Sequence, residues 1–269
     1  MSEEGSTYLD RILAAKKAQL ASIRRNNWNV AELEKELARL PAPLNFREAL
    51  QSSGRAGFGI GVIAEFKRAS PSEGVLRDNA DPRAIAEMYA EAGAAAISVL
   101  TDGHFHGSLD DLQLVRSHVD LPLLCKDFIL HRSQIIDARI HGADAVLLIV
   151  SALQPPLLRE LVEFARQIGM QVLCEAHNSI EIDRALAVGA EIIGINNRDL
   201  RTFELDVERC IALRKNIPRS HVAVAESGIR TRDDVHLLRQ AGIDAMLVGT
   251  HLMRSEHPGR ALIELVSQN

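Results

Sequence analysis

One short pattern recurs four times along this chain and constrains its fold more than any other feature. In each copy a glycine ends a helical pattern and a run of mainly apolar residues follows: Gly93-Ala-Ala-Ala-Ile-Ser-Val-Leu, Gly142-Ala-Asp-Ala-Val-Leu-Leu-Ile, Gly189-Ala-Glu-Ile-Ile-Gly-Ile-Asn and Gly242-Ile-Asp-Ala-Met-Leu-Val-Gly. Such a glycine is typical of a left-handed helix terminus, and such a run is typical of a buried strand. By subtraction the copies lie 49, 47 and 53 residues apart, which accommodates two strand–helix units each.

Further apolar runs lie between these copies and before the first one. Together the eight runs begin near residues 61, 96, 121, 144, 171, 192, 221 and 245. Helical patterns separate them, such as the one that Asp81-Pro82 opens with a capping residue and a proline at the first helical position. An open doubly wound sheet and a closed barrel both fit this alternation. The near-uniform unit, and the lack of a Gly-x-Gly-x-x-Gly turn after the first strand, favour an α/β fold of the (β/α)8 TIM-barrel class.

The first 50 residues precede this alternation and predict helices of their own. Apolar spacing predicts one helix from Leu9 to Ile23 and another from Leu33 to Leu40, and Asn45-Phe-Arg-Glu48 resembles a capping box that opens a third. No Gly/Ser linker separates them from the barrel. We therefore predict a single domain over residues 1–269, with the barrel in 61–269 and the helices of 1–50 covering one of its ends.

Composition excludes several classes of function. The formal net charge is −5 and no basic block occurs, which argues against a nucleic-acid partner. The apolar runs are too short to span a membrane, and the polar N-terminus is unlike a signal peptide. The three cysteines are scattered and form no CxxC pair, which indicates the reducing cytoplasm. We expect a monomer or a weak homodimer.

Charged and amide side chains stand where five predicted strands end. Residues two apart on a strand share a face, and the groups predicted in this way to face inward are Glu65, Lys67, Lys126, Glu175, Asn196, Arg198 and Glu226. One such residue alone is usually a solvated residue at the barrel rim. Groups of both signs at five strand ends predict an active site, because buried ions are costly unless they are paired. By the same alternation Cys125 and Cys174 face away from it.

This set of residues suits acid–base chemistry. A lysine and a glutamate that face each other across a barrel mouth can act as general acid and general base. We expect burial and the crowding of Lys67, Lys126 and Arg198 to lower the pKa of each lysine. Schiff-base chemistry through a lysine stays open on the residues alone. No metal-ligand pattern is present, and the histidines at 104, 106, 131, 177 and 251 are interpreted as loop and rim residues.

The last two predicted strands carry a second signal. Small residues follow each of them, at Ser227-Gly228 and at Gly249-Thr250. In barrels of this class the loops after the last two strands expose backbone N–H groups that hold phosphate. We therefore predict a phosphate-binding site at Gly228, Gly249 and Thr250.

The motifs together resemble the indole-3-glycerol-phosphate synthase family along nearly the whole chain. The segments that carry the resemblance are Ile63-Ala-Glu-Phe-Lys-Arg-Ala-Ser-Pro-Ser, Cys125-Lys-Asp-Phe, Cys174-Glu-Ala-His-Asn, Gly194-Ile-Asn-Asn-Arg-Asp-Leu, Ala225-Glu-Ser-Gly-Ile and Leu247-Val-Gly-Thr. The resemblance implies a phosphorylated anthranilate–sugar adduct, 1-(2-carboxyphenylamino)-1-deoxyribulose 5-phosphate, as the small-molecule substrate. Ring closure, loss of carbon dioxide and loss of water would then follow without a cofactor.

The resemblance also implies a role for each matched residue. Lys126 would be the general acid of ring closure, Glu175 the acid/base of dehydration and Glu65 the partner that orients the lysines. Lys67 would be a second acid, and Asn196 would position the reacting groups. The substrate-binding set is Arg198, Ser70, Glu226 and Ser227. Relatives often carry Ser or Glu where this chain has Thr250, a mild departure if that position binds through its backbone.

Two rival interpretations differ in class. Phosphoribosylanthranilate isomerase is also a phosphate-binding barrel, but it uses a Cys/Asp pair at other strand ends, which the Lys/Glu set fits poorly. A non-catalytic barrel that binds a sugar phosphate is the alternative. The combination of Lys126, Glu175 and Asn196 argues against it, because a binding-only descendant could lose its acid.

Overall fold

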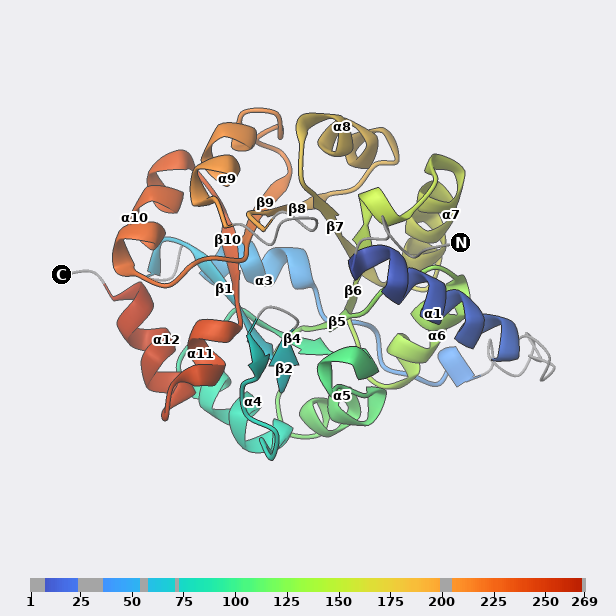
Figure 1. The fold of residues 1–269 in the computed structure, drawn as a ribbon, viewed down its shortest axis with the longest axis horizontal. Coiled ribbons are helices and arrows are strands. Elements are labelled where there is room, and N and C mark those ends of the chain that lie inside the picture. Colours follow the sequence, from blue (N-terminus) through green and yellow to red (C-terminus); the bar gives the residue numbers. More distant parts are fainter. Residues whose placement is uncertain (1–7, 24–35, 54–57, 71–72, 199–204, 268–269) are drawn as a thin grey trace, which may run out of the picture.

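The computed structural model of this chain describes residues 8–23, 36–53, 58–70, 73–198 and 205–267. Eight parallel strands close into a barrel, and helices surround it (Figure 1). The barrel strands are β1 (Gly61–Phe66), β4 (Ala96–Leu100), β5 (Leu123–Lys126), β6 (Ala145–Ile149), β7 (Gln171–Ala176), β8 (Ile192–Asn196), β9 (Val222–Glu226) and β10 (Ala245–Val248). The predicted TIM barrel is confirmed, and each strand begins within about two residues of its predicted start.

Each barrel strand is followed by at least one helix on the outside of the barrel (Figure 1). These helices are α4 (Pro82–Glu91), α5 (Leu109–Arg116), α6 (Arg132–Ile140), α7 (Pro155–Gln167), α8 (Ser179–Ala187), α9 (Val207–Arg214), α10 (Arg232–Ala241), α11 (Thr250–Arg254) and α12 (Pro258–Val266). Short 3-10 turns, η2 (Gly103–Phe105) and η3 (Val150–Ala152), follow β4 and β6. The Asp81 side chain caps α4 as predicted, by accepting from the backbone N–H of Arg83.

The four repeated glycines adopt the conformation that the pattern predicted. Their φ angles are 82° at Gly93, 95° at Gly142, 78° at Gly189 and 75° at Gly242. A left-handed residue at this point ends a helix, and a residue without a β-carbon adopts it at least cost. Each glycine therefore turns the chain from an outer helix back into the next barrel strand.

Two clusters of apolar side chains divide the core according to strand alternation. One fills the barrel interior, where Ile63, Leu124, Leu173 and Val224 meet, and the other lies between the strands and the outer helices. Cys125 and Cys174 belong to the outer cluster and are fully buried, so the prediction that they face away from the mouth is confirmed.

The two described N-terminal helices lie at opposite ends of the barrel. Helix α3 (Phe46–Ser53) closes the end where the strands begin: Phe46 and Leu50 join the interior cluster, and the backbone N–H of Arg47 donates to the Gln171 side chain at the start of β7. Helix α1 (Tyr8–Ile23) lies at the other end, where Ile12 lines the barrel mouth. The expectation that these helices cover one end is corrected, because an amphipathic pattern shows that a face is buried and not which surface buries it. The expected helix at 33–40 lies mostly outside the described residues.

A short hairpin interrupts the connection from β1 to α4. Its strands are β2 (Ala69–Ser70) and β3 (Gly74–Val75), which pair antiparallel. Arg68 holds the start of this hairpin, because its guanidinium donates to both carboxylate oxygens of Asp111 on α5, at 2.6 and 2.8 Å. The connection that carries Lys67 is thereby tied to the neighbouring unit of the barrel.

Candidate active site

Strand alternation brings the predicted acid–base residues together at the end of the barrel where the strands finish. Glu65, Lys67, Lys126, Glu175 and Asn196 all line one cavity there. Four of them lie on the same strand face as an interior apolar residue, as Glu65 does two positions after Ile63, and Lys67 follows directly after β1. The sequence-based prediction of which groups meet is therefore realised in the fold.

Glu65 lies at the base of the cluster and contacts both lysines. Its carboxylate oxygens lie 2.9 Å from Lys67 Nζ and 3.1 Å from Lys126 Nζ. Burial alone would raise the pKa of Glu65, but the two ammonium groups outweigh it and lower the pKa to about 2. Gly249 makes room for this carboxylate, since a β-carbon at that position would lie 2.3 Å from Glu65 Oε1.

Lys126 is surrounded by carboxylates. Its Nζ lies 3.1 Å from Glu65 and 3.1 Å from Glu226, and Glu175 adds a further electrostatic interaction. Burial would lower the pKa of Lys126, but the three carboxylates together raise it well above its ordinary value. The expectation of a lowered pKa is wrong for Lys126, because its nearest charged neighbours are anions rather than Lys67 and Arg198.

Glu226 is fully buried beneath Lys126. Burial, with added repulsion from Glu175 and Glu65, raises the pKa of Glu226 to about 7 against the pull of Lys126. Its Oε1 atom has no hydrogen-bond partner among the described residues, and a β-carbon at Gly194 would lie 2.1 Å from that atom. Glu226 was predicted to bind substrate, but it does not line the cavity. The structure places its carboxylate 3.1 Å from Lys126 Nζ instead.

Glu175 has a partner that the sequence interpretation missed. His177 lies two residues further along, with its Nε2 atom 3.5 Å from Glu175 and its Nδ1 atom 3.2 Å from Glu181 on α8. Burial would lower the pKa of His177, but Glu181 and Glu175 raise it. His177 was interpreted as a loop residue; its position on the face of Glu175 was the available signal.

The residues after β8, β9 and β10 form one side of the cavity rim. Ser227, Gly228, Arg198 and Thr250 all line the cavity, whereas Gly249 does not. Ser227 and Gly228 have φ angles of 66° and 80°, so the backbone passes through the left-handed region at two successive residues of this rim. Arg230, which the sequence interpretation did not single out, adds a second guanidinium to this rim.

Apolar side chains form the opposite side of the same cavity. The residues that contribute are Leu9, Ile12, Leu100, Phe105, Phe128, Leu147 and Ile149. Phe105 and Phe128 are stacked with ring centroids 6.2 Å apart. Ser70 of β2 also lines the cavity, while residues 71–72 and 199–204 of the matched motifs lie outside the described part of the chain.

Fold and site together define a (β/α)8-barrel enzyme whose mouth combines acid–base groups, an apolar wall and a cation-lined rim. The family model for indole-3-glycerol phosphate synthase matches residues 9–265. The chain belongs to the indole-3-glycerol phosphate synthase family.

Named relatives agree with this assignment, and a solved structure agrees with the fold. The chain is 45% identical to indole-3-glycerol phosphate synthase from Koribacter versatilis (strain Ellin345), over 97% of this chain and 99% of that protein. It is also 45% identical to the synthase from Mycolicibacterium vanbaalenii, over 97% of this chain and 94% of the relative. The barrel of 3-hexulose-6-phosphate synthase from Salmonella typhimurium superimposes with a TM-score of 0.63 over 77% of this chain and 97% of that one. At 12% identity this last likeness concerns the fold alone.

Proposed function

We propose that this chain converts 1-(2-carboxyphenylamino)-1-deoxyribulose 5-phosphate into indole-3-glycerol phosphate, carbon dioxide and water, as a carboxy-lyase of tryptophan biosynthesis. The observation that carries the proposal is the position of Lys126, whose ammonium lies in the barrel mouth among Glu65, Glu226 and Glu175. That cluster keeps Lys126 protonated at neutral pH. It thereby supplies the acid that an attack on a ketose carbonyl requires.

In the first step the ring carbon that bears the carboxylate attacks the ketose carbonyl. Lys126 donates its proton to the carbonyl oxygen as the carbon–carbon bond forms. Lys67 lines the same cavity and contacts Glu65, and it is assigned the role of a second acid. Glu65 holds both ammonium groups and is itself ionised, since its pKa is about 2. Glu65 is therefore assigned the task of orienting the lysines.

Decarboxylation and dehydration then complete the indole. The bond to the carboxylate breaks, and the adjacent iminium nitrogen accepts its electron pair, so the substrate supplies its own electron sink. Glu175 is assigned the proton transfer that accompanies loss of the hydroxyl group as water. The imidazole of His177, with its Nε2 atom 3.5 Å from Glu175, can orient this carboxylate as an ion-pair partner when it is protonated.

The two sides of the cavity suit the two ends of this substrate. The apolar wall that includes Phe105 and Phe128 fits an aromatic ring. The rim of Ser227, Gly228 and Thr250 is assigned the phosphate, with Arg198 and Arg230 as cations beside it. Asn196, whose Oδ1 atom accepts from the backbone N–H of Arg198 at 2.9 Å, is assigned the positioning of substrate between them.

The test is turnover of the synthetic adduct, followed by the growth of indole fluorescence. Wild-type protein is expected to turn it over, and Lys126→Met to lose at least roughly a thousandfold in kcat. Lys215→Met, at an exposed lysine outside the site, is the control and should match wild type. Tight binding of the adduct without turnover by the wild type would favour the alternative, a sugar-phosphate-binding barrel without catalysis.

We also propose that residues 1–269 act as one domain, located in the cytoplasm, as a monomer or a weak homodimer. The buried, unpaired Cys125, Cys174 and Cys210 support a reducing compartment. None of the described helices is long and apolar enough to cross a membrane.

The described residues contain no cluster of three or more His, Cys, Asp or Glu side chains able to hold a metal.

A further inference from the structure

Helix α1 contributes directly to the cavity that contains Lys126. Leu9 and Ile12 of this helix line the cavity, and Ile12 is almost completely buried. The helix precedes the barrel in the sequence and joins no strand of it, so contacts at the mouth must hold it there (Figure 1). The placement of Leu9 and Ile12 therefore depends on whatever fixes α1.

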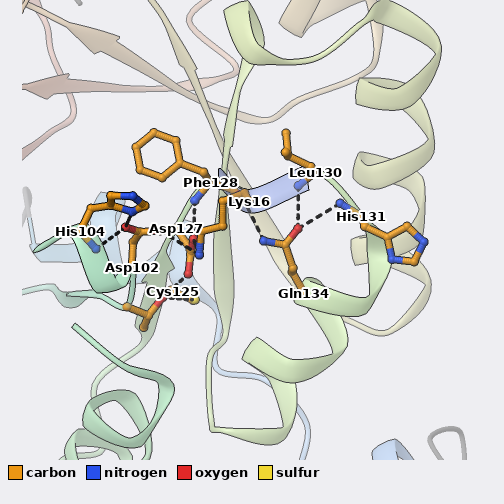
Figure 2. Close-up of polar contacts among 10 residues, drawn as sticks. Lys16, Asp102, His104, Cys125, Asp127, Phe128, Leu130, His131 and Gln134 are labelled. Carbon is orange, nitrogen blue, oxygen red and sulfur yellow. Dashed lines mark hydrogen bonds and ion pairs between the residues drawn. The ribbon is translucent and has the colours of Figure 1, made fainter. Parts of the chain in front are cut away.

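One buried ion cluster fixes α1 to the barrel. Lys16 lies one helical turn after Ile12, and its Nζ atom is 2.8 Å from Asp102 and 2.6 Å from Asp127 (Figure 2). Asp102 and Asp127 follow strands β4 and β5, so a single side chain joins α1 to two neighbouring strand ends. Lys16 and Asp102 are buried.

Both carboxylates are themselves held by the barrel (Figure 2). Asp102 Oδ1 accepts from the backbone N–H of His104 at 2.8 Å. Asp127 accepts from the Thr101 hydroxyl at 2.9 Å and from the backbone N–H of Phe128 at 2.6 Å. Lys16 thus meets acceptors whose positions are already set, which is the condition under which a buried ion pair is effective.

The cluster also adjoins the acid–base residues. Asp127 lies between Lys126 and Phe128 in the chain, and all three line the cavity. Burial would lower the pKa of Lys16, but Asp127 and Asp102 raise it, so the ammonium is retained at neutral pH. The charge of Lys16 therefore connects α1 with the segment that contains Lys126.

We propose that Lys16 is a positioning residue that clamps α1 over the barrel mouth and so holds Leu9 and Ile12 against the bound substrate. The effect is on substrate binding, because the acid–base groups come from the barrel strands and Lys126 is held by Glu65 and Glu226 rather than by α1. The inference rests on the proposed function for its kinetic readout.

The test compares Lys16→Met with Lys17→Met, since the neighbouring Lys17 is exposed on the same helix. For Lys16→Met we expect KM for the adduct to rise roughly tenfold with kcat within about threefold of wild type, because ordered apolar side chains contribute to binding. Lys16→Arg keeps the charge and should restore KM. Amide hydrogen exchange should accelerate in residues 8–23 of Lys16→Met and stay unchanged in Lys17→Met.

Equal KM and equal exchange in the two methionine variants would overturn the clamp, and so would a loss of kcat with KM unchanged. If Lys16→Met does not fold, Asp102→Asn replaces it, because asparagine still accepts from His104 but has lost the charge that Lys16 meets. Asp102→Asn should raise KM by a smaller factor than Lys16→Met and should accelerate amide hydrogen exchange in residues 8–23. Wild-type KM together with wild-type exchange in Asp102→Asn would refute the clamp. If the wild type does not turn over the adduct, the proposed function fails, and hydrogen exchange alone decides the clamp.

Discussion

Neutralising Glu226 is expected to stabilise this protein above neutral pH and to have little effect in weak acid. Its carboxylate is fully buried, and one of its oxygens has no hydrogen-bond partner among the described residues. In this cluster three carboxylates surround two ammonium groups: Glu65, Glu175 and Glu226 with Lys67 and Lys126. The site therefore carries one negative charge more than its lysines can balance. Glu226→Gln removes that charge and keeps nearly the same shape.

The sign and size of the effect follow from the pKa of Glu226. Burial and the neighbouring carboxylates raise this pKa from an ordinary 4.5 to about 7 in the folded protein. The folded state thus binds the proton more tightly than the unfolded chain, and stability falls as the pH rises from 4.5 to about 7. At roughly 1.4 kcal/mol per pH unit the full loss is about 3 kcal/mol, which glutamine avoids.

Urea unfolding of both proteins at about pH 5 and about pH 8, followed by circular dichroism, measures the difference. Near pH 5 Glu226 is protonated in the folded state and only the first part of the loss has occurred, so the two proteins should differ by less than about 1 kcal/mol. Near pH 8 the Glu226→Gln protein should unfold at a higher urea concentration, by up to about 3 kcal/mol in stability. A variant that is less stable than wild type by the same amount at both pH values would refute the reasoning. It would mean that Glu226 is a well-compensated ion.

Two further predictions concern Glu65, the other carboxylate that contacts Lys126. Glu65→Gln should have the opposite sign: the pKa of Glu65 is lowered to about 2, so its stabilisation is present above pH 4.5 and lost as the pH falls through about 2. In urea unfolding near pH 7 the Glu65→Gln protein should be less stable than wild type by about 3 kcal/mol, and this difference should shrink between pH 4.5 and about pH 3. A difference in stability that stays constant over this pH range would contradict the lowered pKa of Glu65. Gly249→Ala should cost about 1–3 kcal/mol, because its β-carbon would lie 2.3 Å from Glu65 Oε1. Gly103→Ala, which meets nothing within 4 Å, is the control, and equal urea midpoints for the two alanine variants would contradict the packing argument.

The barrel and the membership of its acid–base cluster were within reach of the sequence. Apolar runs and left-handed glycines are local features of the sequence. The spacing between the four copies indicated how many strand–helix units the chain contains. Strand alternation is equally local, so it assigns Glu65, Lys126 and Glu175 to the interior face from the sequence alone. The closed barrel then required those faces to converge at one end.

The environment of each group was decided by the tertiary structure. The sequence contains the charges of Lys126 and Glu226 but not the distances between them, and the pKa of a buried group depends on those distances and on desolvation. Likewise, helix pattern alone could not assign α1 and α3 to opposite ends of the barrel, since it records only that each has an apolar face. The sequence by itself determined which residues share a strand face, because that depends on the chain's own period of two. Only the tertiary structure decided which charges become neighbours, because those contacts join residues as far apart in the chain as Lys16 and Asp127.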